Sequence, residues 1–183
     1  MKRIAILSSL LAVCFGIAVE AQTAPQPAPE FQPLRGVLGN WTYTCDYQAG
    51  PLGPAGSSAG EYNNQMILGG FFMKGLWKEK GRGAELEGID ILRYDPEHKN
   101  FVYSGYENDG GTYSGTITIT GTVEKDEGKF FVGGKEYQAR TAITYSADWT
   151  SADWKAEVSS DGKTWSPWFE QKMTKVKPKT KTK

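Results

Sequence analysis

Short segments of alternating polar and apolar residues fill most of the chain, and this pattern constrains the fold more than any other feature. In residues 112–123, Thr116 and Thr118 face one way while Ile117 and Ile119 face the other. A period of two residues is typical of a strand that buries one face. Beyond residue 38, no window of a dozen residues shows a helical period. The sequence therefore predicts an all-β fold.

Turn residues separate these segments. Glycine pairs, Asp-Pro and Asn-Asp-Gly-Gly favour tight connections because Gly and Asn tolerate positive φ and Pro cannot join a strand ladder. We expect a flexible loop at 50–60, a turn at 124–128, and strands at 41–47, 61–69, 71–80, 84–94, 101–106, 112–123, 129–133, 137–146, 154–159 and 168–175. Successive hairpins without crossover helices predict an antiparallel up-and-down β-barrel of about ten strands. A closed barrel leaves no free strand edge.

The N-terminal segment has the pattern of an export signal. Lys2 and Arg3 precede an apolar run that ends near Val19, and Ala21 offers a small residue at the cleavage point. Residues 1–21 are therefore predicted to be a signal peptide, which would place the mature protein in the periplasm or outside the cell. The alternative is a lipoprotein anchor on Cys14. Residues 22–33 contain four prolines, so we expect an extended, unpacked lead-in.

Charge is distributed unevenly along the chain. Residues 22–171 hold 13 Lys and Arg against 20 Asp and Glu, a net charge of −7, whereas residues 172–183 hold six Lys and no acid. We expect 176–183 to be a disordered tail that could contact an anionic surface weakly. The tail has no aromatic residue, which argues against single-stranded nucleic acid as a partner. We expect a monomer, with Cys45 as a lone buried thiol after signal cleavage.

Catalytic and metal-binding patterns are lacking in the sequence. His98 is the single histidine and sits in a Pro-Glu-His-Lys turn, where it is expected to be solvated rather than a haem ligand. There is no nucleophile elbow, phosphate loop or zinc-type spacing. We therefore expect neither enzymatic activity, nor a metal, nor a cofactor.

Aromatic residues in the strands raise the question of what the barrel encloses. Tyr43, Trp77 and Tyr103 lie mid-strand and are the candidates to line a ligand cavity; the alternative is that such rings simply form a filled core. Arg93 shares strand parity with Ile89 and Ile91. It is therefore a candidate to face inward, unless it forms an ion pair at the barrel rim.

A family resemblance supports the barrel. Gly39-Asn40-Trp41 is similar to the GxW signature of the calycin superfamily, which includes the lipocalins. A wider resemblance is to the bacterial family DUF1579. The matching pieces are Gly39–Trp41, Leu68–Phe72, Gly88 with Tyr94-Asp95-Pro96, Ser159–Trp165, and Glu170 ahead of a final basic residue. The resemblance implies a lipocalin-like barrel over 34–175. It also implies that Trp41 packs against a basic residue of the last strand, here Lys175 or Lys172.

These observations lead to one expected function and one alternative. The expected function is an exported, non-catalytic barrel that binds a small apolar or amphipathic ligand, which calycins often hold. The alternative is a carbohydrate-binding or surface-interaction domain with a filled core. That domain would carry a row of exposed Trp rings.

Overall fold

A computed structural model describes residues 25–177. The predicted signal peptide, the alternative acylation site at Cys14 and tail residues 178–183 lie outside the described residues. Within the described part, no helix is both long enough and apolar enough to cross a membrane.

Ten β-strands and three short 3-10 helices make up the domain. The helices are η1 (Pro29–Phe31), η2 (Pro33–Val37) and η3 (Leu68–Gly70). The strands are β1 (Gly39–Tyr47), β2 (Gly56–Ile67), β3 (Phe72–Gly81), β4 (Ala84–Asp95), β5 (Asn100–Glu107), β6 (Thr112–Thr120), β7 (Val123–Val132), β8 (Lys135–Tyr145), β9 (Ser151–Ser159) and β10 (Ser166–Lys175).

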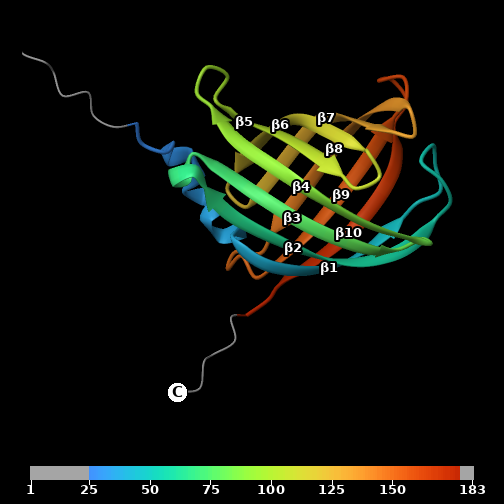
Figure 1. Cartoon of the computed structure of the whole chain (residues 1–183), viewed down its shortest axis with the longest axis horizontal. Helices are drawn as coiled ribbons and strands as arrows, with labels where there is room; N and C mark the ends of the chain where they lie inside the picture. The colour runs from blue at the N-terminus through green and yellow to red at the C-terminus, as the bar shows by residue number, and fades with distance from the viewer. Residues whose placement is uncertain (1–24, 178–183) are drawn as a thin grey trace, which may run out of the picture.

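Each strand pairs antiparallel with its neighbour in sequence, and β1 also pairs with β10. This last pairing closes the sheet into a barrel, which Figure 1 shows from the side. The prediction of an antiparallel ten-stranded up-and-down barrel is confirmed. No strand edge is left unpaired in the barrel, so its stability does not depend on a second sheet.

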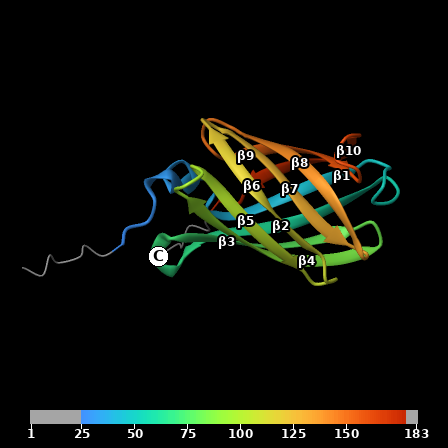
Figure 2. The ribbon, with the colours of Figure 1, turned by 90° about the horizontal axis from the view of Figure 1, so that it is seen from above.

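The helices η1 and η2 cover one end of the barrel, called here the capped end (Figures 1 and 2). Phe31, Leu34 and Val37 are buried there against three inward residues of the barrel, Leu92, Phe101 and Ile117. The rings of Phe31 and Phe101 meet edge to face with centroids 5.1 Å apart. The expectation of an unpacked lead-in is therefore wrong for residues 29–33, because Phe31 has an apolar site to fill.

Two predicted loops are also corrected. Residues 56–60, predicted to lie in a flexible loop, belong to β2 and pair with the second half of β1. Ser58 is buried there, and Gly60 leaves room for the Tyr43 ring. The turn expected at 124–128 lies earlier, at 121–122, where Gly121 has a φ of 60°. Residues 124–128 are therefore strand, and this shift places two acidic side chains inside the barrel.

Candidate functional site

The barrel interior is the candidate site, and side-chain contacts across it define which residues face inward. The indole nitrogen Nε1 of Trp77 on β3 donates to the hydroxyl of Tyr113 on β6 over 2.9 Å. Strands β4 and β5 lie between them in the sheet. A hydrogen bond that skips two strands has to run through the lumen, so both rings lie inside.

Asp90 on β4 continues this hydrogen-bond chain. The Tyr113 hydroxyl, which accepts from Trp77, donates in turn to the Asp90 carboxylate. Burial raises the pKa of Asp90 from 3.8 to about 7; the Tyr113 hydrogen bond opposes that rise and the charge of Glu107 adds to it. A carboxyl group whose pKa is close to 7 can be either protonated or ionised at neutral pH.

Two further acids face the lumen from β7. Glu124 and Asp126 are only 9% and 7% exposed. Tyr145 donates to Glu124 over 3.1 Å, and Asp126 accepts from Thr141 and, over 3.5 Å, from Tyr103. Burial raises the pKa of Glu124 to about 7 and that of Asp126 to about 6. Tyrosine hydroxyls are thus the main partners of the buried carboxyl groups.

Glu79 and Glu107 lie toward the end opposite the cap, called here the far end. The hydroxyl of Tyr47 on β1 donates to Glu79 on β3 over 2.9 Å, across β2. Burial raises the pKa of Glu107 to about 7, with further contributions from the charges of Asp109 and Glu79. Five acids therefore face the interior from four strands, and we call this set the acidic wall: Glu79, Asp90, Glu107, Glu124 and Asp126.

Basic residues do not neutralise the acidic wall. Every ion pair found within residues 25–177 joins Lys, Arg or His to an acid outside this set, such as Lys78 with Glu87 or Arg140 with Glu157. Over the same residues, no three His, Cys, Asp or Glu side chains come together as metal ligands would. The acids are spread along the lumen rather than gathered at one point.

Glycines make room for the inward rings. A Cβ atom on Gly88 would lie 2.5 Å from the Trp77 indole, and one on Gly105 would lie 2.0 Å from the Tyr113 ring. Each ring therefore lies flat against the backbone of the neighbouring strand. Trp77, Tyr103 and Tyr113 are nevertheless only half-buried, although they lie inside a closed barrel. Part of each ring therefore remains accessible to solvent.

The opposite side of the lumen is more tightly packed and has a different polarity. Near the far end, the ring of Phe130 stacks on Trp168 with centroids 4.8 Å apart, bridging β7 and β10 through the interior. Three buried nitrogen donors on this side find no hydrogen-bond acceptor among the described residues: Trp154 Nε1, Trp168 Nε1 and Gln171 Nε2. We call these three residues the donor wall. A buried donor without an acceptor costs free energy, and a ligand that supplies a hydrogen-bond acceptor would relieve that cost.

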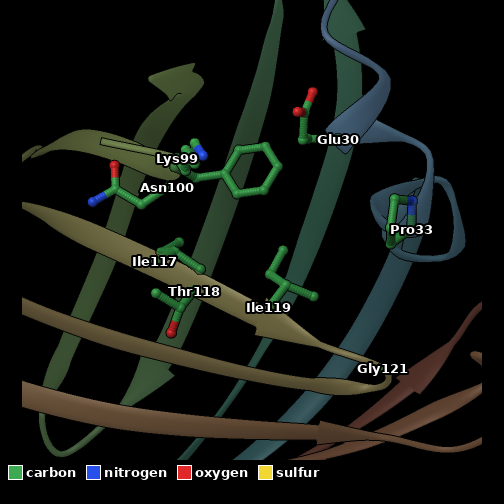
Figure 3. Close-up of a pocket in the computed structure, with 9 residues that line it drawn as sticks. Glu30, Pro33, Lys99, Asn100, Ile117, Thr118, Ile119 and Gly121 are labelled. Atoms are coloured by element: carbon green, nitrogen blue, oxygen red, sulfur yellow. The ribbon is translucent and has the colours of Figure 1, made fainter. Parts of the chain in front are cut away.

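Two hollows in the described molecule lie away from Trp77, Tyr103 and Tyr113. A crevice of about 300 Å³ runs between the cap and the ends of β5 and β6, with Glu30 and Pro33 on one side and Asn100, Phe101 and Ile117 on the other (Figure 3). A second depression, of about 740 Å³, crosses the strands β7 to β10. It is lined largely by charged residues such as Lys125, Arg140 and Glu170, and Asp126 of the acidic wall also lines it. Neither is lined by the predicted cavity residues.

The predicted cavity residues divide into two groups. Tyr43, Trp77 and Tyr103 all face the lumen, where Tyr43 donates over 3.4 Å to the backbone oxygen of Lys78. Arg93 does not face the lumen. Its side chain is 47% exposed and lies 3.7 Å from Asp95 near the capped end. The inward candidate position is therefore wrong for Arg93, and the alternative, an ion pair at the barrel rim, is found instead. Asp90 and Leu92, rather than Ile89 and Ile91, hold the inward positions of β4.

The barrel signature residues form one cluster below the cap. Trp41 is 1% exposed and its Nε1 donates to the Val37 oxygen over 2.8 Å. Lys175 Nζ lies 5.4 Å from the centroid of the Trp41 ring and donates over 2.6 Å to the Gly36 oxygen. Gly39 has a φ of 104°, which favours glycine where the chain turns from the cap into β1. Lys175, and not Lys172, is the basic partner.

A family model described as "Protein of unknown function (DUF1579)" matches residues 26–177. The chain belongs to this family. Because the match spans all ten strands, the barrel, its cap and both walls of the lumen lie within the DUF1579 region.

Solved structures similar to this DUF1579 chain are also barrels. Rv2717c from M. tuberculosis is 14% identical with a TM-score of 0.60, covering 83% of this chain and 100% of that one. The S-type phycobiliprotein lyase CPES from Guillardia theta is 10% identical with a TM-score of 0.51, covering 80% of this chain and 91% of that one. No curated protein sequence matches the chain. At these identities the likeness concerns the fold alone.

Sequence reasoning missed the acidic wall of this DUF1579 protein. On β4 the usual pattern is inverted, since Ile89 and Ile91 point outward while Gly88 and Asp90 point inward. Glu124 and Asp126 were assigned to a turn. The available signal was the pairing of inward glycines with aromatic residues on neighbouring strands. Such local violations of the polar-out rule are expected at functional sites.

Proposed function

We propose that this protein is an exported, monomeric, non-catalytic binding protein that holds one small amphipathic molecule inside its barrel. The observation that carries the proposal is the half-buried state of Trp77, Tyr103 and Tyr113 in the lumen of a closed, capped barrel. Rings with hydroxyl and indole groups offer both apolar surface and hydrogen bonds, which suits an amphipathic guest.

Within residues 25–177, Cys45 and His98 are not placed for catalysis, which supports a binding role. Burial raises the pKa of Cys45 to about 12, so its thiol is a poor nucleophile at neutral pH. His98 is 66% exposed on its turn and contacts Asp95, away from the lumen. The inward acids Asp90 and Asp126 are engaged by tyrosine and threonine hydroxyls rather than facing a candidate nucleophile.

The alternative of a carbohydrate-binding surface finds no matching observation. The large apolar side chains exposed on the described part of the molecule include Leu68, Tyr106 and Phe131 but no Trp. Trp165, in the hairpin singled out from the sequence, is covered by the guanidinium of Arg140 at 4.4 Å. We therefore place the binding site in the lumen.

Native mass spectrometry of the protein purified from its own source tests the proposal. We expect a mass above that of the cleaved polypeptide, which is lost on denaturation, and the polypeptide mass itself would report whether residues 1–21 are removed. A protein that retains no extra mass and binds no apolar dye would refute ligand carriage.

A further inference from the structure

The acidic wall has a consequence for the kind of molecule the lumen accepts. Each of its five carboxyl groups is partly or fully withdrawn from water, and none pairs with a basic residue of the described chain. Burying acids without a counter-charge is unfavourable. Tyrosine hydroxyls offset part of that cost at Glu79, Asp90, Glu124 and Asp126. A cation in the lumen would relieve that cost directly.

Aromatic rings beside these acids add a second attraction for a cation. The Tyr103 and Tyr113 rings lie with centroids 6.3 Å apart, and their hydroxyls contact Asp126 and Asp90. Trp77 is joined to the same group by its bond to Tyr113. An ammonium group between carboxylates and ring faces is stabilised by both, because the faces of aromatic rings carry negative potential.

The far end has the same polarity. Glu79 and Glu107 are the inward acids nearest to it, and the charge of Glu79 contributes to the raised pKa of Glu107. Arg82 lies close to this end, but its guanidinium covers the Tyr47 ring at 4.3 Å and donates to the Leu52 and Pro54 backbone oxygens instead of to an inward acid. A lumen of one sign concentrates ligands of the opposite sign.

The donor wall supplies an independent indication that the lumen is built for a guest. Gln171 is 6% exposed, lies among the inward residues of β10, and leaves its Nε2 donor unpaired. Trp154 on β9, its partner across the strands, likewise leaves its Nε1 donor unpaired. A guest with an uncharged oxygen could satisfy this side while its cationic group faced the acidic wall.

We propose that the lumen is selective for small amphipathic molecules that carry a protonated amine. The amine lies between Asp90 and Asp126 against the rings of Trp77, Tyr103 and Tyr113, and its apolar part extends along the lumen. This inference rests on the proposed function and adds the charge class of the ligand. Carboxylate-bearing molecules, such as fatty acids, are excluded by the same wall.

Three probes of one shape and different charge test the inference: octylamine, octanol and octanoate, titrated calorimetrically into the full-length mature protein at pH 8. We expect octylamine to bind at least about tenfold more tightly than octanol, and octanoate to bind most weakly. The double variant Asp90→Asn, Asp126→Asn should bring octylamine to the affinity of octanol. Glu127→Gln, which removes an outward charge next to Asp126, is the matched control and should retain the preference.

Each outcome has a separate meaning. Octanol or octanoate binding as tightly as octylamine would overturn the charge preference and leave ligand carriage standing. An octylamine preference that survives the double Asn variant would overturn the assigned location. If no probe binds and no mass is retained by the native protein, carriage itself fails. Should the double variant not fold, the wild-type comparison of three probes still decides the charge preference.

Discussion

The Trp77 indole donates a hydrogen bond to the Tyr113 hydroxyl across the lumen, and that hydroxyl donates a hydrogen bond to Asp90. Three strands are therefore linked from the inside as well as through the sheet. Replacing Tyr113 with Phe removes the hydroxyl and leaves the Asp90 carboxyl without its donor. We expect the pKa of Asp90 to rise further above about 7, since the Tyr113 hydrogen bond currently lowers it. Carboxyl-carbon NMR during a pH titration measures this; an unchanged or lower pKa would contradict the assignment.

Stability should fall as pH rises through neutrality. The pKa values of Asp90, Glu107 and Glu124 are about 7 in the folded protein, above their ordinary values, so the folded state binds more protons than the unfolded chain. The contribution of these three protonated acids to the free energy of unfolding is fully present below about pH 4. It is lost as pH rises through about 7. Asp161, with a pKa lowered to about 2, acts in the opposite sense only below about pH 4.

Thermal unfolding at several pH values measures this dependence. We expect a midpoint at pH 5 that is roughly 5–10 °C higher than at pH 8. Asp90→Asn should reduce the difference, because the amide has no proton to lose. A midpoint that rises between pH 5 and 8 would mean that the acidic wall is not buried as described.

The glycine that lies under the Tyr113 ring should tolerate no side chain. In Gly105→Ala the new methyl group would meet that ring at 2.0 Å, so the ring or the backbone has to move. We expect a loss of about 1–3 kcal/mol in the free energy of urea unfolding, typical of overpacking. Gly50→Ala is the control, because a Cβ there has no neighbour within 4 Å. Equal stability of the two variants would show that the lumen is looser than the structure indicates.

Lys175 should anchor the cap, whereas Lys172 should not. Lys175 bonds to the Gly36 oxygen and lies over the Trp41 ring, while Lys172 is exposed. Lys175→Met leaves a carbonyl of η2 unpaired and should cost about 1–3 kcal/mol of unfolding free energy, with Lys172→Met near neutral. Faster amide hydrogen exchange in residues 29–37 should accompany the loss. A cap that stays protected in Lys175→Met would assign its stability to apolar packing alone.

The alternation of residues, its turn chemistry and the Gly39–Trp41 signature were enough to predict the class of fold and its closure. Strand periodicity is local, and a barrel follows when every strand needs two partners. The same periodicity predicted inward positions for Tyr43, Trp77 and Tyr103, and burial of Cys45. These features are properties of short segments, which the sequence contains in full.

Which face of a strand turns inward was decided by the tertiary structure where polarity gave the wrong answer. Asp90 occupies an inward position of β4 because its hydrogen-bond donor, Tyr113, comes from β6, and the separation in sequence hides that pairing. Arg93 was a candidate for the lumen because it shares strand parity with Ile89 and Ile91, which point outward. Because the turn lies at Gly121, Glu124 and Asp126 belong to β7 and their side chains are buried. Buried charge is stabilised by partners distant in sequence, so only the closed barrel showed that its lumen is acidic.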